Sequence, residues 1–164
     1  MELTKEAKSF MKMSTGFKFK LFLLRDLPMG FIAGLRIREL TPEKCVVSIP
    51  YKYLTRNPFK SMYFACLAMA AEMSTGALGV AASFGQKDPS IAMLVGGLEG
   101  EFTKKAVGLI RFTCLDGHKQ FEAVERAKTS GQGETATCLT VGTDEEGDEV
   151  ARFKFTWSYK ARSR

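Results

Sequence analysis

The chain of 164 residues has the length of one domain, since domains usually contain about 100–200 residues. With 45% hydrophobic and 26% charged residues, its composition is that of an ordinary globular protein. This excludes a disordered tail, a disulfide-stapled secreted module and a collagen-like chain. The 24 basic and 18 acidic residues give a net charge of +6, which indicates an anionic ligand or partner without identifying it.

The beginning of the chain is charged and lacks the apolar core and cleavage site of a signal peptide, so we expect a cytoplasmic protein. An amphipathic helix is predicted next, from apolar residues that recur at steps of three and four: Phe10, Met13, Phe17, Leu21 and Leu24. Lysines occupy mostly its other faces. The favoured interpretation is a helix packed on the edge of the domain, and the alternative is a helix that lies on a membrane surface.

Two strands, residues 31–40 and 44–50, should form a hairpin around a tight turn. The following loop should stay extended because Pro58 disfavours helical geometry at the preceding residue. A long helix is then expected from residue 60 or 61 to about residue 84. From Ser61 to Phe84 the only charged residue is Glu72. A carboxylate in mid-bilayer is costly, so a buried core helix is favoured over a transmembrane segment.

The second half of the chain is rich in predicted strands, with one short helix at residues 118–128. The strands are expected over 91–102, 106–115, 134–142 and 150–160. The last one alternates apolar and polar residues, which indicates one solvated face. Short connections favour antiparallel pairing. The chain therefore predicts an α+β fold: a curved antiparallel sheet of about six strands wrapped around the long central helix, in one domain over 1–164 with a helical extension at 1–28.

Cysteine and histidine offer little for metal or triad chemistry. The four cysteines show no C-x-x-C pair, so we expect reduced buried thiols and no metal site. The only histidine, His118, lies in a polar turn, and every Ser-His-Asp or Cys-His scheme would depend on it.

Glu72 is the most informative residue of the sequence. Apolar neighbours in the helix should desolvate its carboxyl group and raise its pKa. A structural pairing and a chemical role are equally open for such a group. Asn57 lies fifteen positions earlier, just before the helix. The amide, the free N–H groups at the helix start and the carboxylate could together hold and polarise a carbonyl, and activate a water or attack directly.

This pattern resembles the hotdog-fold acyl-CoA thioesterases of the phenylacetate-pathway type. In that family an Asn is followed six residues later by His-Gly-Gly, and an acid lies nine residues after the His. Asn57 matches the Asn, residues 63–65 fall on His-Gly-Gly, and Glu72 falls on the acid. The Ser74-Thr75-Gly76 stretch and residues 101–106 are also similar to the family. The resemblance covers roughly residues 29–159 and implies the hotdog fold.

The resemblance also implies the roles of the site residues. Glu72 would be the general base or nucleophile, Asn57 would orient the water or the thioester carbonyl, and the N–H of Phe64 would stabilise the oxyanion. The chain departs from the family where Tyr63, Phe64 and Ala65 replace His-Gly-Gly. A second departure is Val95-Gly96, on the third strand, where the family often has a polar residue. We expect these positions to line the substrate site, with the Phe64 side chain crowding it.

The implied reaction is hydrolysis of an acyl-CoA to free acid and CoA, with no cofactor other than the CoA of the substrate. Arg56, Lys60, Lys104 and Lys105 could meet the phosphates of CoA, and the alternative is that they are solvated surface charges. The resemblance implies a homo-oligomer, a dimer or a dimer of dimers, with its sites at the subunit seam.

Three other functions compete with hydrolysis. The leading alternative is a non-catalytic acyl- or lipid-binding hotdog domain, in which Phe64 blocks the approach of the thioester. A dehydratase would need a histidine near the long helix. Nucleic-acid binding is disfavoured because the aromatic residues of the last strand should face the core.

Overall fold

The computed structural model describes residues 3–87 and 89–162. Its helices and strands, in chain order, are α1 (Lys5–Ser14), α2 (Phe17–Asp26), α3 (Pro28–Ala33), β1 (Arg36–Leu40), β2 (Cys45–Pro50), the 3₁₀ helix η1 (Tyr53–Thr55), α4 (Phe64–Ser83), β3 (Ser90–Phe102), β4 (Leu109–Cys114), α5 (Gly117–Ser130), β5 (Gly133–Thr143) and β6 (Glu149–Arg162).

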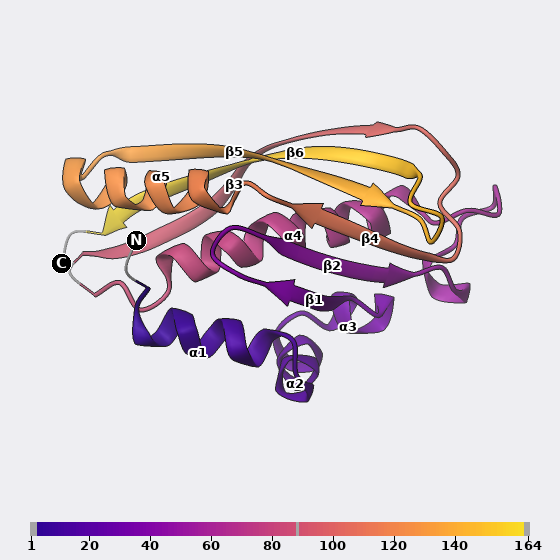
Figure 1. Cartoon of the computed structure of the whole chain (residues 1–164), viewed down its shortest axis with the longest axis horizontal. Coiled ribbons are helices and arrows are strands. Elements are labelled where there is room, and N and C mark those ends of the chain that lie inside the picture. Colours follow the sequence, from indigo (N-terminus) through magenta and orange to yellow (C-terminus); the bar gives the residue numbers. More distant parts are fainter. Residues whose placement is uncertain (1–2, 88, 163–164) are drawn as a thin grey trace.

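The six strands form one antiparallel sheet in the order β1-β2-β4-β5-β6-β3. The sheet curves around α4, as Figure 1 shows, and α5 covers one end of it. This confirms the α+β architecture expected from the sequence. The two edges of the sheet differ. The β1 edge is short, charged and interrupted by a bulge, whereas β3 is long and largely apolar.

Helix α4 is buried because small residues let the sheet approach it closely. A Cβ atom at Gly76 would lie only 3.0 Å from the ring of Trp157. In the described part of the chain, α4 is the one helix long and apolar enough to cross a membrane. Thirteen of its twenty residues are buried inside the protein, as expected for a core helix.

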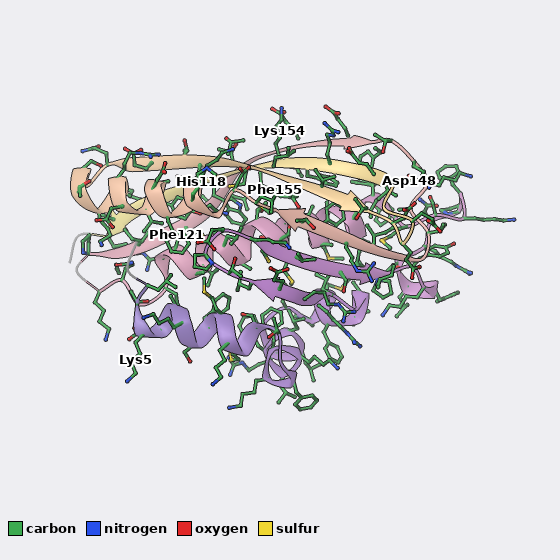
Figure 2. The ribbon with its side chains drawn as sticks, in the orientation of Figure 1. Lys5, His118, Phe121, Asp148, Lys154 and Phe155 are labelled. Atoms are coloured by element: carbon green, nitrogen blue, oxygen red, sulfur yellow. The ribbon has the colours of Figure 1, made fainter. Side chains whose placement is uncertain are left out.

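Strand β6 has one buried face and one face toward solvent. Its aromatic residues Phe153, Phe155, Trp157 and Tyr159 are all buried. Lys154, between Phe153 and Phe155, and Lys160, directly after Tyr159, are exposed. Figure 2 shows Lys154 pointing away from the sheet and Phe155 pointing toward α4. The alternation predicted for the last strand is therefore confirmed.

The N-terminal helix is present but divided. Gly16 is extended, with φ −100° and ψ −179°, and begins α2 as its N-cap, so the chain turns between α1 and α2. A second difference follows at residues 31–33, which were expected to begin a strand and instead complete α3. Pro28 occupies the first turn of α3, where its fixed φ suits a helix. Gly34, at φ 84°, ends it, and β1 begins only at Arg36.

The start of α4 also differs from the prediction. It begins at Phe64, a few residues later than residue 60 or 61. The residues before it form a closed loop in which Arg56 bridges to Met62. Lys60 lies at the tip of this loop with φ 57°, the one non-glycine residue with a left-handed backbone in the described ranges. This backbone is incompatible with a helix.

Candidate active site at the start of helix α4

A pocket of about 650 Å³ lies where the loop before α4 meets the end of β3. The predicted site residues that line it are Asn57, Tyr63, Phe64, Lys104 and Lys105. Six other predicted site residues are not among its lining residues: Arg56, Lys60, Ala65, Glu72, Val95 and Gly96. The structure therefore gathers about half of the predicted site around this pocket.

The Asn57 side chain is turned into its own loop. Its Nδ2 donates to Ser61 Oγ at 3.1 Å and to the carbonyl of Met62 at 3.2 Å. Its Oδ1 accepts from the backbone N–H of Phe59 at 2.9 Å and of Ser61 at 3.3 Å. With both ends of the amide used, Asn57 holds the loop that leads into α4 and so places the helix start.

Two backbone N–H groups at the start of α4 face no acceptor. The helix has no side-chain N-cap, since Tyr63 occupies that position. The N–H groups of Cys66 and Leu67 donate to the Tyr63 carbonyl. Those of Phe64 and Ala65 have no hydrogen-bond acceptor among the described residues. Such unsatisfied donors suit an anion or a developing oxyanion.

The Phe64 ring stands at the edge of the pocket. Its centroid lies 4.9 Å from that of Tyr63 and 6.4 Å from that of Phe102, both in edge-on geometry. The ring is 56% exposed, so it is not part of the core. It narrows the approach to the unsatisfied N–H groups beside it, where the family pattern has glycine.

Glu72 lies two turns further along α4 and is half-buried. Its Oε1 is 3.2 Å from the position that a Cβ of Gly76 would occupy, so the carboxyl group covers the glycine beside Trp157. Burial raises the pKa of the Glu72 carboxyl group. No side chain or backbone group of the described residues donates a hydrogen bond to it or forms an ion pair with it. The structural pairing left open by the sequence is therefore absent from this part of the chain.

A buried hydrogen-bond chain fixes the turn of α4 that carries Glu72. Trp157 Nε1 donates to Thr75 Oγ1 at 3.0 Å, and Thr75 Oγ1 donates to the carbonyl of Glu72 at 3.0 Å. Gln120 Nε2 donates to the Thr75 carbonyl at 2.6 Å, and the Tyr159 hydroxyl donates to Gln120 Oε1. The sequence marked Thr75 only as part of the family-like Ser-Thr-Gly stretch. No signal in it identified Gln120.

Val95 and Gly96 lie near this second region rather than near the pocket. Val95 pairs with Trp157 across β3 and β6, and the register shifts at Gly96, where β3 has a bulge. The predicted site is thus divided along α4 into two groups, one at the helix start and one around Glu72.

The basic residues differ in what they contact. Lys104 Nζ lies 2.7 Å from both Asp144 Oδ2 and Asp148 Oδ2, and these bonds raise its pKa. It holds the turn between β5 and β6, although it lines the pocket. The Arg56 guanidinium lies 4.3 Å from the ring centroid of Tyr53. Lys60 and Lys105 are exposed, and neither forms an ion pair with a residue that the structure describes.

His118 is not among the residues that line the pocket at the start of α4. It lines a separate cavity of about 980 Å³ between the beginning of α1, the end of α4 and α5. Figure 2 labels His118 with Lys5 and Phe121 in that region. Within residues 3–87 and 89–162, no three of the Cys, His, Asp and Glu side chains form a metal-binding group. All four cysteines are buried and unpaired by disulfides.

Comparison with known proteins identifies a family and a fold. The model of the family described as "Domain of unknown function (DUF4442)" matches residues 17–159. No curated protein matches the chain significantly. Among solved structures, PA5026 of Pseudomonas aeruginosa, described as a probable thioesterase, has a TM-score of 0.74 at 23% identity. That match covers 90% of this chain and 97% of the other.

Two further similar structures are named thioesterases. PA1618 of P. aeruginosa, solved as a mutant, has a TM-score of 0.67 at 11% identity and covers 90% of this chain and 95% of its own. HI1161 of Haemophilus influenzae has a TM-score of 0.61 at 11% identity, with coverages of 86% and 88%. At these low identities, the TM-scores show a shared fold and nothing about a shared reaction. The chain has the hotdog fold, as the sequence resemblance implied.

Proposed function

Since the chain belongs to the DUF4442 family, whose description assigns no reaction, we propose from the site itself that it is a thioester hydrolase. The substrate we propose is an acyl-CoA, which would be cleaved to a free acid and CoA. The observation that carries this proposal is Glu72, a half-buried carboxyl group with a raised pKa and no partner in the described structure. Such a group is suited to general-base catalysis near neutral pH.

The reaction needs one proton acceptor and one oxyanion site. Glu72 takes a proton from a water molecule, and the resulting hydroxide attacks the thioester carbonyl. The N–H groups of Phe64 and Ala65 donate to the oxyanion of the tetrahedral intermediate. When the intermediate collapses, the C–S bond breaks, and the proton held by Glu72 goes to the departing CoA thiolate. Asn57 acts by holding the loop and thus the position of these N–H groups.

The separation of these groups supports a homo-oligomer. Glu72 and Phe64 are eight residues apart, or about 12 Å along a helix axis, which is more than a glutamate side chain spans. The neighbouring edge strand β3 exposes Leu94, Leu98 and Phe102. An unpaired apolar edge of this length favours pairing with a second copy. In such a dimer, Glu72 of one copy and the start of α4 of its partner would form one site.

CoA would be held by the remaining basic residues around the loop. Arg56, Lys60 and Lys105 are exposed and could meet its phosphates, whereas Lys104 is already paired with two aspartates. CoA thioesters and four reduced thiols both suit the cytoplasm.

The test is thiol release from a panel of short, medium, long and aromatic acyl-CoAs. Wild type is compared with Glu72→Gln and with Glu122→Gln, a matched change in the distant α5. We expect release by wild type and Glu122→Gln, and a loss of at least about 100-fold in Glu72→Gln. Full activity of Glu72→Gln would exclude the proposed mechanism.

A non-catalytic acyl-binding domain remains the second candidate, and the Phe64 ring beside the pocket is the observation that favours it. This function predicts that acyl-CoA raises the melting temperature of the wild type while no thiol is released. A thermal shift measured on the same panel separates the two functions.

A further inference from the structure

Helix α2 presents an apolar stripe to the outside of the molecule. Phe19 and Leu23 point into the core, whereas Phe17, Leu21 and Leu24 are 70%, 53% and 52% exposed. The exposed three recur at i, i+4 and i+7, so they form one line along the helix, opposite the buried pair. In Figure 1, α2 projects from the side of the molecule away from β5 and β6. The described chain leaves this line uncovered.

The apolar surface continues onto the next helix. Helix α3 packs against α2. Leu27, between the two helices, and Met29 and Ile32 of α3 are also exposed. We call these six residues (Phe17, Leu21, Leu24, Leu27, Met29 and Ile32) the α2–α3 face. Exposed apolar side chains gathered on two helices that pack together indicate an interaction site rather than ordinary surface.

Positive charge borders the α2–α3 face. Lys18 and Lys20 lie on either side of the apolar line of α2 by their helical positions, and both are exposed. Neither forms an ion pair with a described residue, whereas Arg25 pairs with Asp26 at 2.8 Å. A cleft of about 320 Å³ adjoins the beginning of α2, and its lining includes Lys20, Arg36 and Arg38. Its charged lining residues are therefore all cationic.

We propose that the α2–α3 face docks on a membrane surface that contains anionic lipids. A helix with an apolar line between lysines lies in the plane of the interface, with the apolar side chains among the acyl chains and the lysines at the headgroups. The cleft beside it is placed to receive a lipid phosphate. Docking of two copies through this face is disfavoured, because it would bring two groups of unpaired lysines together.

Docking would also orient the candidate active site. Helix α3 contacts η1, which leads into the loop before α4. Tyr53, Leu54 and Phe59 of this segment are exposed apolar residues as well. The proposal does not depend on hydrolysis, since it rests on the surface alone.

The test is co-sedimentation of the full chain with two kinds of vesicle, pure phosphatidylcholine and an equal mixture of phosphatidylcholine and phosphatidylglycerol. We expect binding to the mixed vesicles that weakens with added salt, and little binding to the neutral ones. Leu21→Glu with Leu24→Glu should abolish it. Lys18→Glu with Lys20→Glu should weaken it by at least about 25-fold, because each lost lysine costs roughly 1 kcal/mol and each new glutamate repels the anionic lipids. Leu115→Glu changes a leucine that is 63% exposed elsewhere and should bind as wild type does.

Equal sedimentation of the Leu21/Leu24 variant and wild type, or no wild-type binding to mixed vesicles at low salt, would overturn the proposal. Sedimentation velocity decides the remaining case. If the same double variant is smaller than wild type in solution, the face is covered by a second copy and the membrane proposal fails. If the assembly size is unchanged while vesicle binding is lost, the proposal stands. Circular dichroism confirms that each variant is folded.

Discussion

The indole N–H of Trp157 donates a 3.0 Å hydrogen bond to the hydroxyl group of Thr75, and the same hydroxyl donates to the carbonyl of Glu72. One buried residue of β6 thus sets the position of the turn of α4 that carries the proposed general base. The contact joins residues 82 positions apart in the chain.

Trp157→Phe should therefore impair both stability and catalysis. Removal of the indole donor is expected to lower the free energy of unfolding by about 1–3 kcal/mol. A displaced Glu72 should lower kcat by up to about 100-fold with little change in KM. Chemical denaturation and steady-state kinetics measure the two effects, and Ser158→Ala, at the next position of β6, serves as the control. A loss of stability with unchanged kcat would show that Trp157 does not position Glu72.

Glu72→Gln should stabilise the protein at neutral pH. Because burial raises the pKa of Glu72 in the folded state, the native state binds its proton more readily than the unfolded chain does. The wild type should therefore lose stability as the pH rises from the ordinary carboxyl pKa through the raised one. Glutamine lacks this titration. Melting temperatures of both proteins, measured from mildly acidic to neutral pH, should diverge as the pH rises. Parallel curves would contradict the burial of an ionised carboxylate.

The pH dependence of turnover should follow the same group. A general base must be ionised, so kcat should rise with pH through the raised pKa of Glu72. The midpoint should lie above about 4.3, the ordinary pKa of a glutamate. A rate that falls over this range would instead require the protonated form of the carboxyl group.

Lys104 and Lys105 are neighbours with different expected effects. Lys104→Met removes both ion pairs from the β5–β6 turn and should lower the melting temperature while KM for acyl-CoA stays constant. Lys105→Met should leave the melting temperature unchanged and raise KM by up to about fivefold, the range of an exposed charge contact. If the two effects were exchanged, the proposed binding of CoA would have to be reassigned.

Phe64→Gly tests whether the aromatic ring limits the reaction. The substitution keeps the backbone N–H group and removes the side chain that narrows the pocket, so bulky acyl-CoAs should turn over faster. The expected cost is about 0.5–1 kcal/mol of stability, because glycine is more flexible in the unfolded chain. A panel of acyl groups of increasing size, compared with wild type, should show the largest gain for the largest group. Unchanged kinetics across the panel would mean that the ring does not restrict access.

The sequence was sufficient where local patterns decide the structure. The alternation in β6 and the apolar length of α4 predicted the sheet and its core helix, because both reflect burial that repeats along the chain. Local patterns were less informative around Gly16 and residues 31–33, where two glycines and a proline changed one helix and part of a strand into three short helices. Apolar spacing continues across such breaks, so periodicity alone does not reveal them.

The candidate site was only partly predictable for a different reason. Motif spacing predicted Asn57, Phe64 and Glu72 as site residues. The contacts that hold the structure around them, however, join distant segments of the chain. The ion pair between Lys104 and Asp144 joins positions 40 apart, and the hydrogen bond from Gln120 to Thr75 joins positions 45 apart. No local rule links such pairs, so their roles became visible only in the folded chain.

The unequal edges of the sheet determine how far strand pairing can extend. At the β1 edge, the five residues Arg36–Leu40 include two arginines and a glutamate, and the bulge between Ile37 and Glu39 interrupts the ladder. This edge is a poor template for a further strand. Strand β3 has thirteen residues and, in spite of its own bulge at Gly96, is the longer of the two edge strands in the described chain. If two copies paired through β3, only their β1 edges would stay open. Strand pairing would then stop at two copies and would not extend into a fibre.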